Sequence, residues 1–340
     1  MILKSTFFII GVAGLFLIYY FLQPLKKGTG SDTTTKYELV KNWPDLPNEF
    51  ILGNPTGICI DSNQQIVIFH RAEREWPLLD KMPDSPIKAN TVLFINCSSG
   101  KLIKSWGNHL FIMPHGLTVD HENNIWVTDV GLHQVFKFSH NGKLLLTLGK
   151  AKVSGNDSLH FNKPTDVAIA NDGSIFVSDG YGNSRVIKFS VNGKYLFEWG
   201  KKGENESEFN IPHALSLDKK GNLYVADREN NRIQVFDPNG KFIRQFSSHS
   251  FGSICSVTFN KTQSKMFAID DVSFLKIKHR GSDVFVFDST GKVQSRFGRS
   301  GSYTGANSWY HDLTIDKDDN IYVGDISGNK LQKFRKVSNQ

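Results

Sequence analysis

Residues 212–218 read PHALSLD, and closely similar segments read PHGLTVD at 114–120 and YHDLTID at 310–316. Three more distant copies read PTGICID at 55–61, PTDVAIA at 164–170 and ICSVTFN at 254–260. His115 and His213 hold the same position in their copies and lie 98 residues apart (213 − 115) with one copy between them, so the period is about 49 residues. Such a period is typical of solenoids and propellers.

Each copy is followed by three further short apolar segments. After 114–120 the chain continues with IWVTD at 125–129, VFKF at 135–138 and, beyond an Asn-Gly-Lys turn, LLLTL at 144–148. Four short antiparallel strands joined by tight turns form one propeller blade. The six copies therefore predict an all-β, six-bladed β-propeller.

The two ends of the chain are expected to close the ring. The last copy ends after its third strand, near Arg335. We expect the extended segment at 37–40 to supply the missing strand. An open solenoid is the alternative, but neither end of the sequence shows a capping repeat with a polar outer face.

Composition supports a folded β protein. The 340 residues are 39% hydrophobic, 12% aromatic and 21% charged and include 29 Gly, which excludes disordered, collagen-like and coiled-coil chains and favours short strands with tight turns. The 40 Lys and Arg exceed the 33 Asp and Glu only mildly, so we expect no nucleic-acid partner, and we expect a monomer. The three cysteines, Cys59, Cys97 and Cys255, allow at most one disulfide.

The N-terminus carries an apolar run at 5–22, which is about the length that spans a bilayer. We assign 1–27 as a transmembrane anchor or signal helix. No small-x-small cleavage site follows the apolar run, so we favour an anchor that stays on the protein over a signal that is removed. Residues 28–36 then form a polar linker and 37–340 the propeller. We expect a membrane-anchored protein whose propeller is extracytoplasmic, or a secreted protein if the segment is cleaved.

Histidine recurs in alternate copies. The second residues of the six copies are, in order, Thr56, His115, Thr165, His213, Cys255 and His311. First strands of propeller blades line the central channel, so three imidazoles from alternate blades should converge. Three His ligands with an open fourth position are typical of catalytic zinc, although a single histidine is more often structural.

Two neighbours of these histidines are further candidates for the channel. Cys255 could place a thiol near the metal, but a small buried apolar residue is the simpler interpretation. Asp312 follows His311, and its carboxylate with main-chain carbonyls of neighbouring first strands would suit a hard cation such as calcium.

The second strands end in a column of repeated Asp residues, which we interpret as bracing the turns. The positions just after this column vary and hold Arg71, Arg228 and, one residue later, Tyr181. A guanidinium matches a carboxylate bidentately, so this set predicts a site for a carboxylate-bearing substrate. An exposed arginine on its own would more often be a solvated surface residue.

Several motifs resemble one enzyme family. They are VIFHR at 67–71, MPHGL at 113–117, WVTDVGLHQVF at 126–136, PTDV at 164–167, FVSDGYGNSR at 176–185 and VADREN at 225–230. Together they are similar to the catalytic core of the peptidyl-α-hydroxyglycine α-amidating lyases, which are six-bladed propellers of NHL-type repeats. The similarity covers about 45–335.

The resemblance implies a set of site residues. Zinc would be held by His115, His213 and His311, and calcium by the main-chain carbonyls of Ile58 and Leu117 with the side chain of Asp312. Tyr181 would be the catalytic base, with Arg71 beside it and Arg228 also in the active site, and one of the two arginines would bind the substrate carboxylate.

The resemblance also implies a reaction. It is cleavage of the N–Cα bond of a C-terminal α-hydroxyglycine, giving a peptide amide and glyoxylate. The substrate would be an α-hydroxyglycine-extended peptide or a related small α-hydroxy amide, and a separate hydroxylating monooxygenase would supply it. Zinc would acidify the substrate hydroxyl, and a tyrosinate whose pKa is lowered by cationic neighbours would remove its proton.

The sequence departs from the animal enzymes near Tyr181. Gly182 stands where a disulfide cysteine follows the tyrosine, and Val225 and Gln234 lie in a blade where a second bridge is expected. We therefore expect a less tethered loop around Tyr181.

Two other function classes are alternatives. One is a non-catalytic NHL scaffold that binds protein or RNA, against which the alternating histidines and the anchor both count. The other is a different propeller metalloenzyme such as a calcium-dependent lactonase, whose site would be built from acidic and amide ligands rather than histidines.

Overall fold

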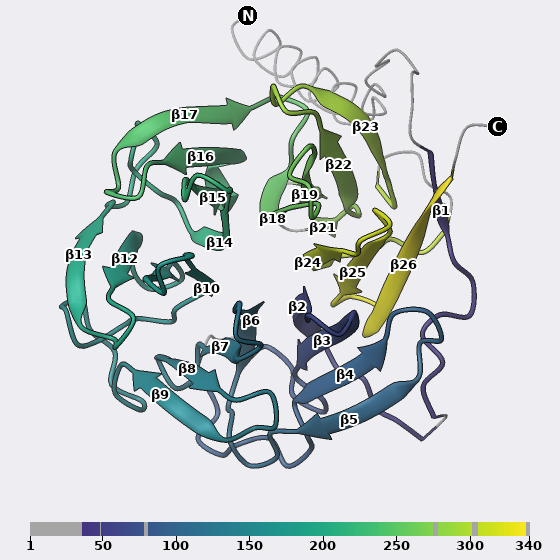
Figure 1. Ribbon diagram of the computed structural model, residues 1–340, viewed down its shortest axis with the longest axis horizontal. Coiled ribbons are helices and arrows are strands. Elements are labelled where there is room, and N and C mark those ends of the chain that lie inside the picture. Colours follow the sequence, from purple (N-terminus) through teal and green to yellow (C-terminus); the bar gives the residue numbers. More distant parts are fainter. Residues whose placement is uncertain (1–35, 48, 78–80, 275–277, 301–304, 338–340) are drawn as a thin grey trace, which may run out of the picture.

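The computed structural model describes residues 36–47, 49–77, 81–274, 278–300 and 305–337. Six four-stranded antiparallel sheets are arranged around a central axis, as the prediction required (Figure 1). The predicted anchor at 1–27 lies outside the described residues. Within the described part of the chain, no helix has the length and apolar character needed to cross a bilayer.

Each blade runs from an inner strand on the axis to an outer strand at the rim. Blade 1 consists of β2 (Pro55–Ile60), β3 (Gln65–His70), β4 (Val92–Asn96) and β5 (Leu102–Trp106). Blade 2 consists of β6 (Pro114–Val119), β7 (Ile125–Asp129), β8 (Gln134–Phe138) and β9 (Leu144–Leu148). Blade 3 consists of β10 (Asp166–Ile169), β11 (Ile175–Asp179), β12 (Arg185–Phe189) and β13 (Tyr195–Trp199).

Blades 4 to 6 follow the same order. Blade 4 consists of β14 (Pro212–Leu217), β15 (Leu223–Asp227), the short helix η1 (Arg228–Asn230), β16 (Arg232–Phe236) and β17 (Phe242–Ser247). Blade 5 consists of β18 (Ser253–Phe259), β19 (Met266–Asp271), β22 (Asp283–Phe287) and β23 (Val293–Gly298), with the added hairpin β20 (Ser273–Phe274) and β21 (Lys278–His279). Blade 6 consists of β24 (Tyr310–Ile315), β25 (Ile321–Asp325), β26 (Lys330–Val337) and β1 (Lys36–Leu39).

The ring is closed by the two ends of the chain. Strand β1 pairs antiparallel with β26, with Lys36 opposite Val337 and Leu39 opposite Phe334. The expected fourth strand of the last blade is therefore confirmed. An open solenoid is excluded, because the first and last blades also contact each other through β2 and β24.

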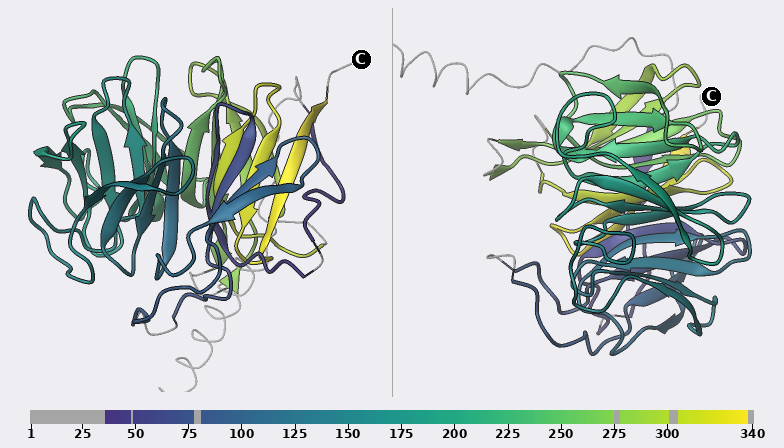
Figure 2. Two further views of the ribbon diagram at one scale, coloured as in Figure 1. Left: turned by 60° about the horizontal axis from the view of Figure 1, so that its bottom comes forward. Right: turned by 90° about the vertical axis from the view of Figure 1, so that its left-hand side faces the viewer.

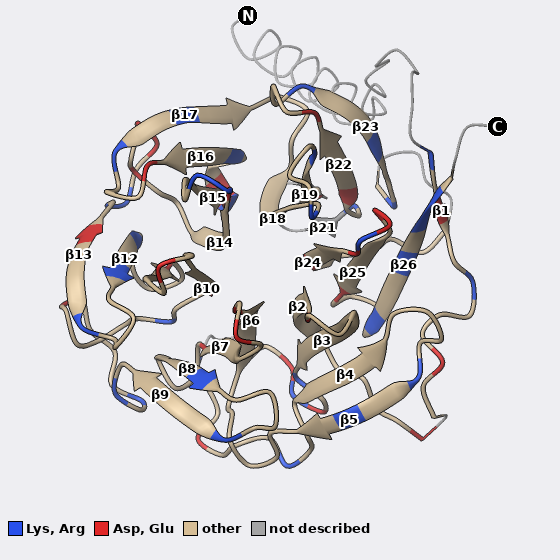
Figure 3. Cartoon of the chain, in the orientation of Figure 1, with Lys and Arg blue, Asp and Glu red and all other residues tan. Residues whose placement is uncertain are grey.

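The core lies between the blades. The second strands β7, β11, β15 and β25 are buried along their whole length, because each is covered by a neighbouring blade on both faces. The hydrophobic clusters join consecutive blades, as where Val67 and Phe94 of blade 1 pack with Val127 of blade 2. Lys and Arg are interspersed with Asp and Glu around the ring (Figure 3).

The first strands are irregular at one point. Their pairing shifts between Pro55 and Gly57 in β2, and at the equivalent positions of β6, β14, β18 and β24. The extra residues at these β-bulges include Thr56, His115, His213, Cys255 and His311. A bulge re-aims a side chain and is common beside active sites.

Two of the connections between second and third strands are longer than the equivalent connections of the other blades. Residues 71–91 join β3 to β4, and 272–282 join β19 to β22 and contain the β20–β21 hairpin. Both protrude from one face of the disc (Figure 2). This is the face at which the bulges lie, since Pro55 at the start of β2 pairs with His70 at the end of β3.

Candidate metal centre and active site

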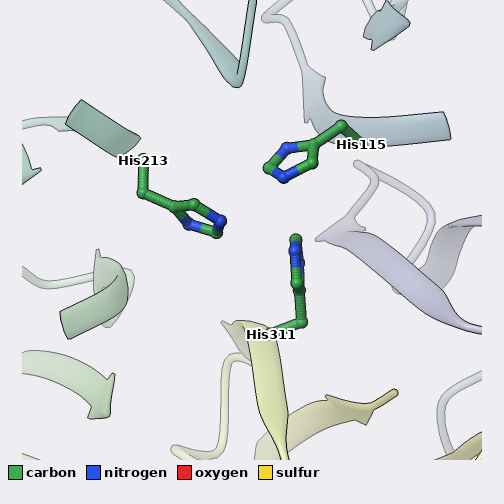
Figure 4. Close-up of side chains that lie close together, drawn as sticks. All are labelled: His115, His213 and His311. Carbon is green, nitrogen blue, oxygen red and sulfur yellow. The ribbon is translucent and has the colours of Figure 1, made fainter. Parts of the chain in front are cut away.

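The three histidines converge on the axis. Ligand nitrogens of His115, His213 and His311 all lie within 4.8 Å of one another, and the three side chains point toward a common centre (Figure 4). The residues are 1%, 2% and 6% exposed. The convergence predicted from the alternation of histidine is confirmed.

Each imidazole is oriented by the next blade. Nδ1 of His115 lies 2.6 Å from the Thr165 carbonyl, Nδ1 of His213 lies 2.6 Å from the Cys255 carbonyl, and Nδ1 of His311 lies 2.7 Å from the Thr56 carbonyl. A carbonyl only accepts, so each Nδ1 carries the proton and each Nε2 presents a lone pair. A carbonyl partner on the second ring nitrogen is the usual support of a metal-binding histidine.

The histidines are held in the neutral form that binds metals. Burial, followed by the neighbouring histidines and arginines, places the pKa values of His115 and His213 well below the ordinary value. Burial lowers the pKa of His311 to about 3. Three neutral, pre-oriented imidazoles fit a divalent metal ion with an open coordination position.

Tyr181 lies beside this centre. Its hydroxyl is 3.0 Å from Nε2 of His115 and 3.2 Å from Nε2 of His213, and it accepts a hydrogen bond of 3.3 Å from Nη1 of Arg228. Burial raises the pKa of Tyr181, whereas the charges of Arg228 and Arg71 lower it less. The expected lowering of the pKa of Tyr181 is therefore wrong for the chain alone, because burial outweighs the two arginines.

The two arginines differ in how free they are. Arg71 is 3% exposed, and its Nε donates to the Pro114 carbonyl at 3.1 Å and its Nη1 to Asn54 Oδ1 at 3.3 Å. The Arg228 side chain is 20% exposed and forms an ion pair with Glu229 at 3.1 Å. Arg228 is thus the more accessible guanidinium beside Tyr181.

Polar contacts hold the loop of Tyr181. The Gly182 amide donates to the Asn162 carbonyl at 2.9 Å, and Asn183 Nδ2 donates to the Gly155 carbonyl at 2.9 Å. The Arg185 guanidinium donates to the carbonyl of His160 at 2.8 Å. A Cβ atom at Gly182 would collide with the Asn162 side chain, so a larger residue there would require Asn162 to move. No disulfide holds this loop, and hydrogen bonds to 155–162 hold it instead. That it is less tethered than in the animal enzymes stays a prediction.

Gln234 makes a similar link in the next blade. Its Nε2 donates to the Glu208 carbonyl at 2.8 Å, and its Oε1 accepts from the Ser207 amide at 3.0 Å. The cysteines form no disulfide: Cys59, Cys97 and Cys255 are free. Cys255 does not join the cluster of possible metal ligands, its Sγ lies 3.5 Å from the Ser253 carbonyl, and burial raises its pKa.

Acidic residues line the channel beyond the histidines. Asp312 Oδ2 accepts from the Ile58 amide at 2.7 Å, and its Oδ1 accepts from Ser256 Oγ at 2.7 Å. The Oδ2 atom of Asp166 accepts from the Leu215 amide at 2.8 Å. Both acids line a cavity of about 560 Å³, together with Leu117, near the turns at the opposite face. The calcium site of Ile58, Leu117 and Asp312 stays a prediction.

Burial shifts both of these carboxyl groups. It raises the pKa of Asp312 to about 7 and, with the nearby Asp312 charge, raises the pKa of Asp166 well above its ordinary value. Sequence reasoning missed Asp166, although it is the third residue of its copy, as Asp312 is in the last copy. Gly116 makes room for Asp166, because a Cβ atom there would lie 2.5 Å from Asp166 Oδ1.

Comparison with known proteins agrees with this architecture. The NHL repeat family matches residues 111–138, 161–189 and 209–236. A gluconolactonase from Xanthomonas campestris has a similar structure, with a TM-score of 0.58 and 15% identity over 85% of this chain and 88% of that one. At this identity the likeness shows the fold alone.

Two relatives are closer in sequence. The peptidylglycine α-amidating monooxygenase of Rattus norvegicus is 34% identical over 309 residues, which cover 85% of this chain but 31% of the rat protein. The chain thus spans about a third of the length of that relative. A probable peptidyl-α-hydroxyglycine α-amidating lyase of Caenorhabditis elegans is 33% identical over 296 residues, which cover 84% of this chain and 83% of the relative. By this near full-length match, the chain belongs to the family of the peptidyl-α-hydroxyglycine α-amidating lyases.

Proposed function

We propose that this protein is a zinc-dependent lyase that cleaves the N–Cα bond of a C-terminal α-hydroxyglycine and releases a peptide amide and glyoxylate. One observation carries the proposal: the Tyr181 hydroxyl lies 3.0 and 3.2 Å from two of three converging imidazole nitrogens. A proton acceptor is thus adjacent to the place where a metal-bound hydroxyl would lie. The names of the family's relatives support the same reaction.

The chain's residues would share the proton transfers. A zinc ion held by the three Nε2 atoms would supply Lewis acidity, making the proton of the substrate hydroxyl easier to remove and favouring ionised Tyr181. Tyr181 takes the hydroxyl proton, the C–O bond becomes the carbonyl of glyoxylate, and the Cα–N bond breaks with its electron pair moving to nitrogen. The amide nitrogen then takes one proton, so the reaction needs no oxidant or reductant.

The arginines would have different tasks. Arg228 is partly exposed and its Nη1 lies 3.3 Å from the Tyr181 hydroxyl, so it suits the substrate carboxylate. Arg71 is buried, and its charge favours the tyrosinate. We therefore assign carboxylate binding to Arg228 and a supporting electrostatic role to Arg71.

The acidic end of the channel would serve stability. Two half-buried carboxyl groups, Asp166 and Asp312, suit a hard cation, and calcium bound by Asp312 with the carbonyls of Ile58 and Leu117 is the proposed occupant. We further propose that the N-terminal segment anchors the protein with its propeller extracytoplasmic, and that a separate monooxygenase supplies the hydroxylated peptide.

The test combines metal analysis with product detection on the full-length protein. We expect about one equivalent of zinc and release of glyoxylate from an α-hydroxyglycine-capped peptide. Tyr181→Phe should keep the zinc and lose most of the rate, and Tyr195→Phe, which removes a phenol on β13, should change neither. Zinc without glyoxylate would refute the lyase, and full activity of Tyr181→Phe would refute its role as the base.

A further inference from the structure

The long connection of blade 1 places an indole beside the reaction centre. The Trp76 ring lies 5.2 Å from the Tyr181 ring, with an interplanar angle of 51°. The guanidinium carbon of Arg71 lies 5.1 Å from the centre of the same indole. Trp76 is partly exposed, so its indole lines the surface beside Tyr181 and is not part of the buried core.

Trp76 belongs to a small apolar surface around Tyr181. Buried side chains of Ile112, Met113 and Val130 form its base. Four partly exposed side chains pack on that base, namely Trp76, Met82, Leu132 and Tyr181. This surface is separate from the cores between the blades and continues up to the tyrosine.

Several contacts fix this surface in place. In the blade 1 connection, Ile87 is fully buried and its amide donates to the Phe111 carbonyl at 2.8 Å. Arg74 Nη2 donates to the Ser85 carbonyl at 3.1 Å, and the Lys152 amide donates to the Leu132 carbonyl at 2.9 Å. Binding pockets for small ligands are usually formed in advance in this way.

The position of the surface indicates what would cover it. In the proposed substrate, the Cα of the residue before the hydroxyglycine lies about 3.8 Å from the reacting carbon, which is the spacing across a trans peptide. Its side chain therefore lies close to Tyr181 whenever the hydroxyl reaches the histidines. The carboxylate points instead toward a guanidinium, so the apolar surface is left for the peptide side.

We propose that Trp76, Met82 and Leu132 form a subsite for the side chain of the residue that precedes the hydroxyglycine, and that this subsite selects large apolar side chains. The inference rests on the proposed lyase function and names the substrate class of that site. Burial of a Phe-sized or Leu-sized side chain against such a surface is the source of the preference.

The test measures kcat/KM for N-acetylated X-α-hydroxyglycine substrates with X as Phe, Leu, Ala or Asp. We expect the wild-type protein to favour Phe and Leu over Ala and Asp. In Trp76→Ala the Phe to Ala ratio should fall about tenfold through KM, and in Leu132→Ala about threefold. Leu159→Ala, which alters a side chain that is 73% exposed and outside the cluster, should leave the ratio unchanged.

Two controls separate this role from others. N-acetyl-Phe-Gly is unreactive, so its inhibition constant reports binding alone. In Trp76→Ala this constant should rise by the same factor as the KM for the Phe substrate. An equal fall of kcat for every X would show that Trp76 only positions Arg71 and Tyr181, and would overturn the subsite. Turnover with an unchanged ratio would overturn the subsite alone, whereas zinc-loaded protein that releases no glyoxylate from any X would overturn both proposals.

Discussion

The two ends of the central channel are made by neighbouring residues of the same strands, yet their chemistry is opposite. His311 lines the end beside Tyr181, and the next residue, Asp312, lines the cavity toward the other face. Thr165 and Asp166 divide in the same way, the first orienting His115 through its carbonyl. In β24 this change of environment coincides with the β-bulge between Tyr310 and Asp312, whereas the pairing of β10 with β11 from Asp166 to Ile169 has no such shift. Under the proposed function one end serves catalysis and the other holds a cation for stability, so the two should fail differently when altered.

Loss of one imidazole should have the largest effect. His213→Ala should lose its zinc, and its rate of glyoxylate formation should fall more than about 100-fold. This fall exceeds the loss of activity that usually follows removal of a group that only hydrogen-bonds to a metal ligand. His140→Ala is the matched control. His140 is not one of the three converging histidines, and its Nε2 lies 2.9 Å from Asp61 Oδ2. Metal analysis with the glyoxylate assay checks both, and full zinc content in His213→Ala would contradict the metal centre.

Removing the accessible guanidinium should have the next largest effect. Arg228→Gln should raise KM about 30-fold, because a charge-assisted hydrogen bond to the carboxylate is lost. Arg244→Gln, which alters an arginine that contacts Phe246 on β17, should leave KM unchanged. Steady-state kinetics of the variants test this prediction. If Arg71→Gln raised KM more than Arg228→Gln does, the roles of the two arginines would be the reverse of those proposed.

The acidic end should respond in stability rather than in rate. Asp312→Asn should lose its calcium and, with calcium at about 100 times the Kd for the wild type, should melt about 5–10 °C lower. Zinc content and kcat should change less than about threefold. Asp288→Asn, which alters a half-buried aspartate that accepts from the Thr290 amide in a turn, is the control for loss of a carboxylate. A large fall in kcat at unchanged melting temperature would show that the two ends are not separate.

The smallest effect concerns a buried carboxyl group that does not line the cavity. Burial raises the pKa of Asp270 to about 7. The unfolded chain, with a pKa of about 3.9, ionises first, so stability falls as pH rises from about 4 to 7 and then levels off. Asp270→Asn should flatten this slope by a few degrees of melting temperature, with or without calcium. Melting curves between pH 5 and 8 test this, and a slope that calcium abolishes would place Asp270 in the cation site.

Much of the fold and of the candidate site was predictable because it repeats. The copies from 55–61 to 310–316 require six blades, and the segment before the first copy had to pair with β26. The 98-residue spacing of the histidines predicted their convergence, since alternate blades of a six-membered ring are related by a third of a turn. Such features depend on spacing along the chain, and spacing is visible in a sequence.

Other features were decided only by tertiary structure. The carbonyls of Thr56, Thr165 and Cys255 orient the imidazoles, but a main-chain carbonyl has no sequence signature. Trp76 reaches Tyr181 from the 71–91 connection, which is much longer than the equivalent connections of blades 2, 3, 4 and 6. The direction of the pKa of Tyr181 depends on how far burial outweighs the arginines, which is a balance set in space. The sequence by itself determined the ring and which residue types meet on its axis, whereas packing between blades determined how each group is oriented, buried and charged, because those contacts join residues with no fixed separation along the chain.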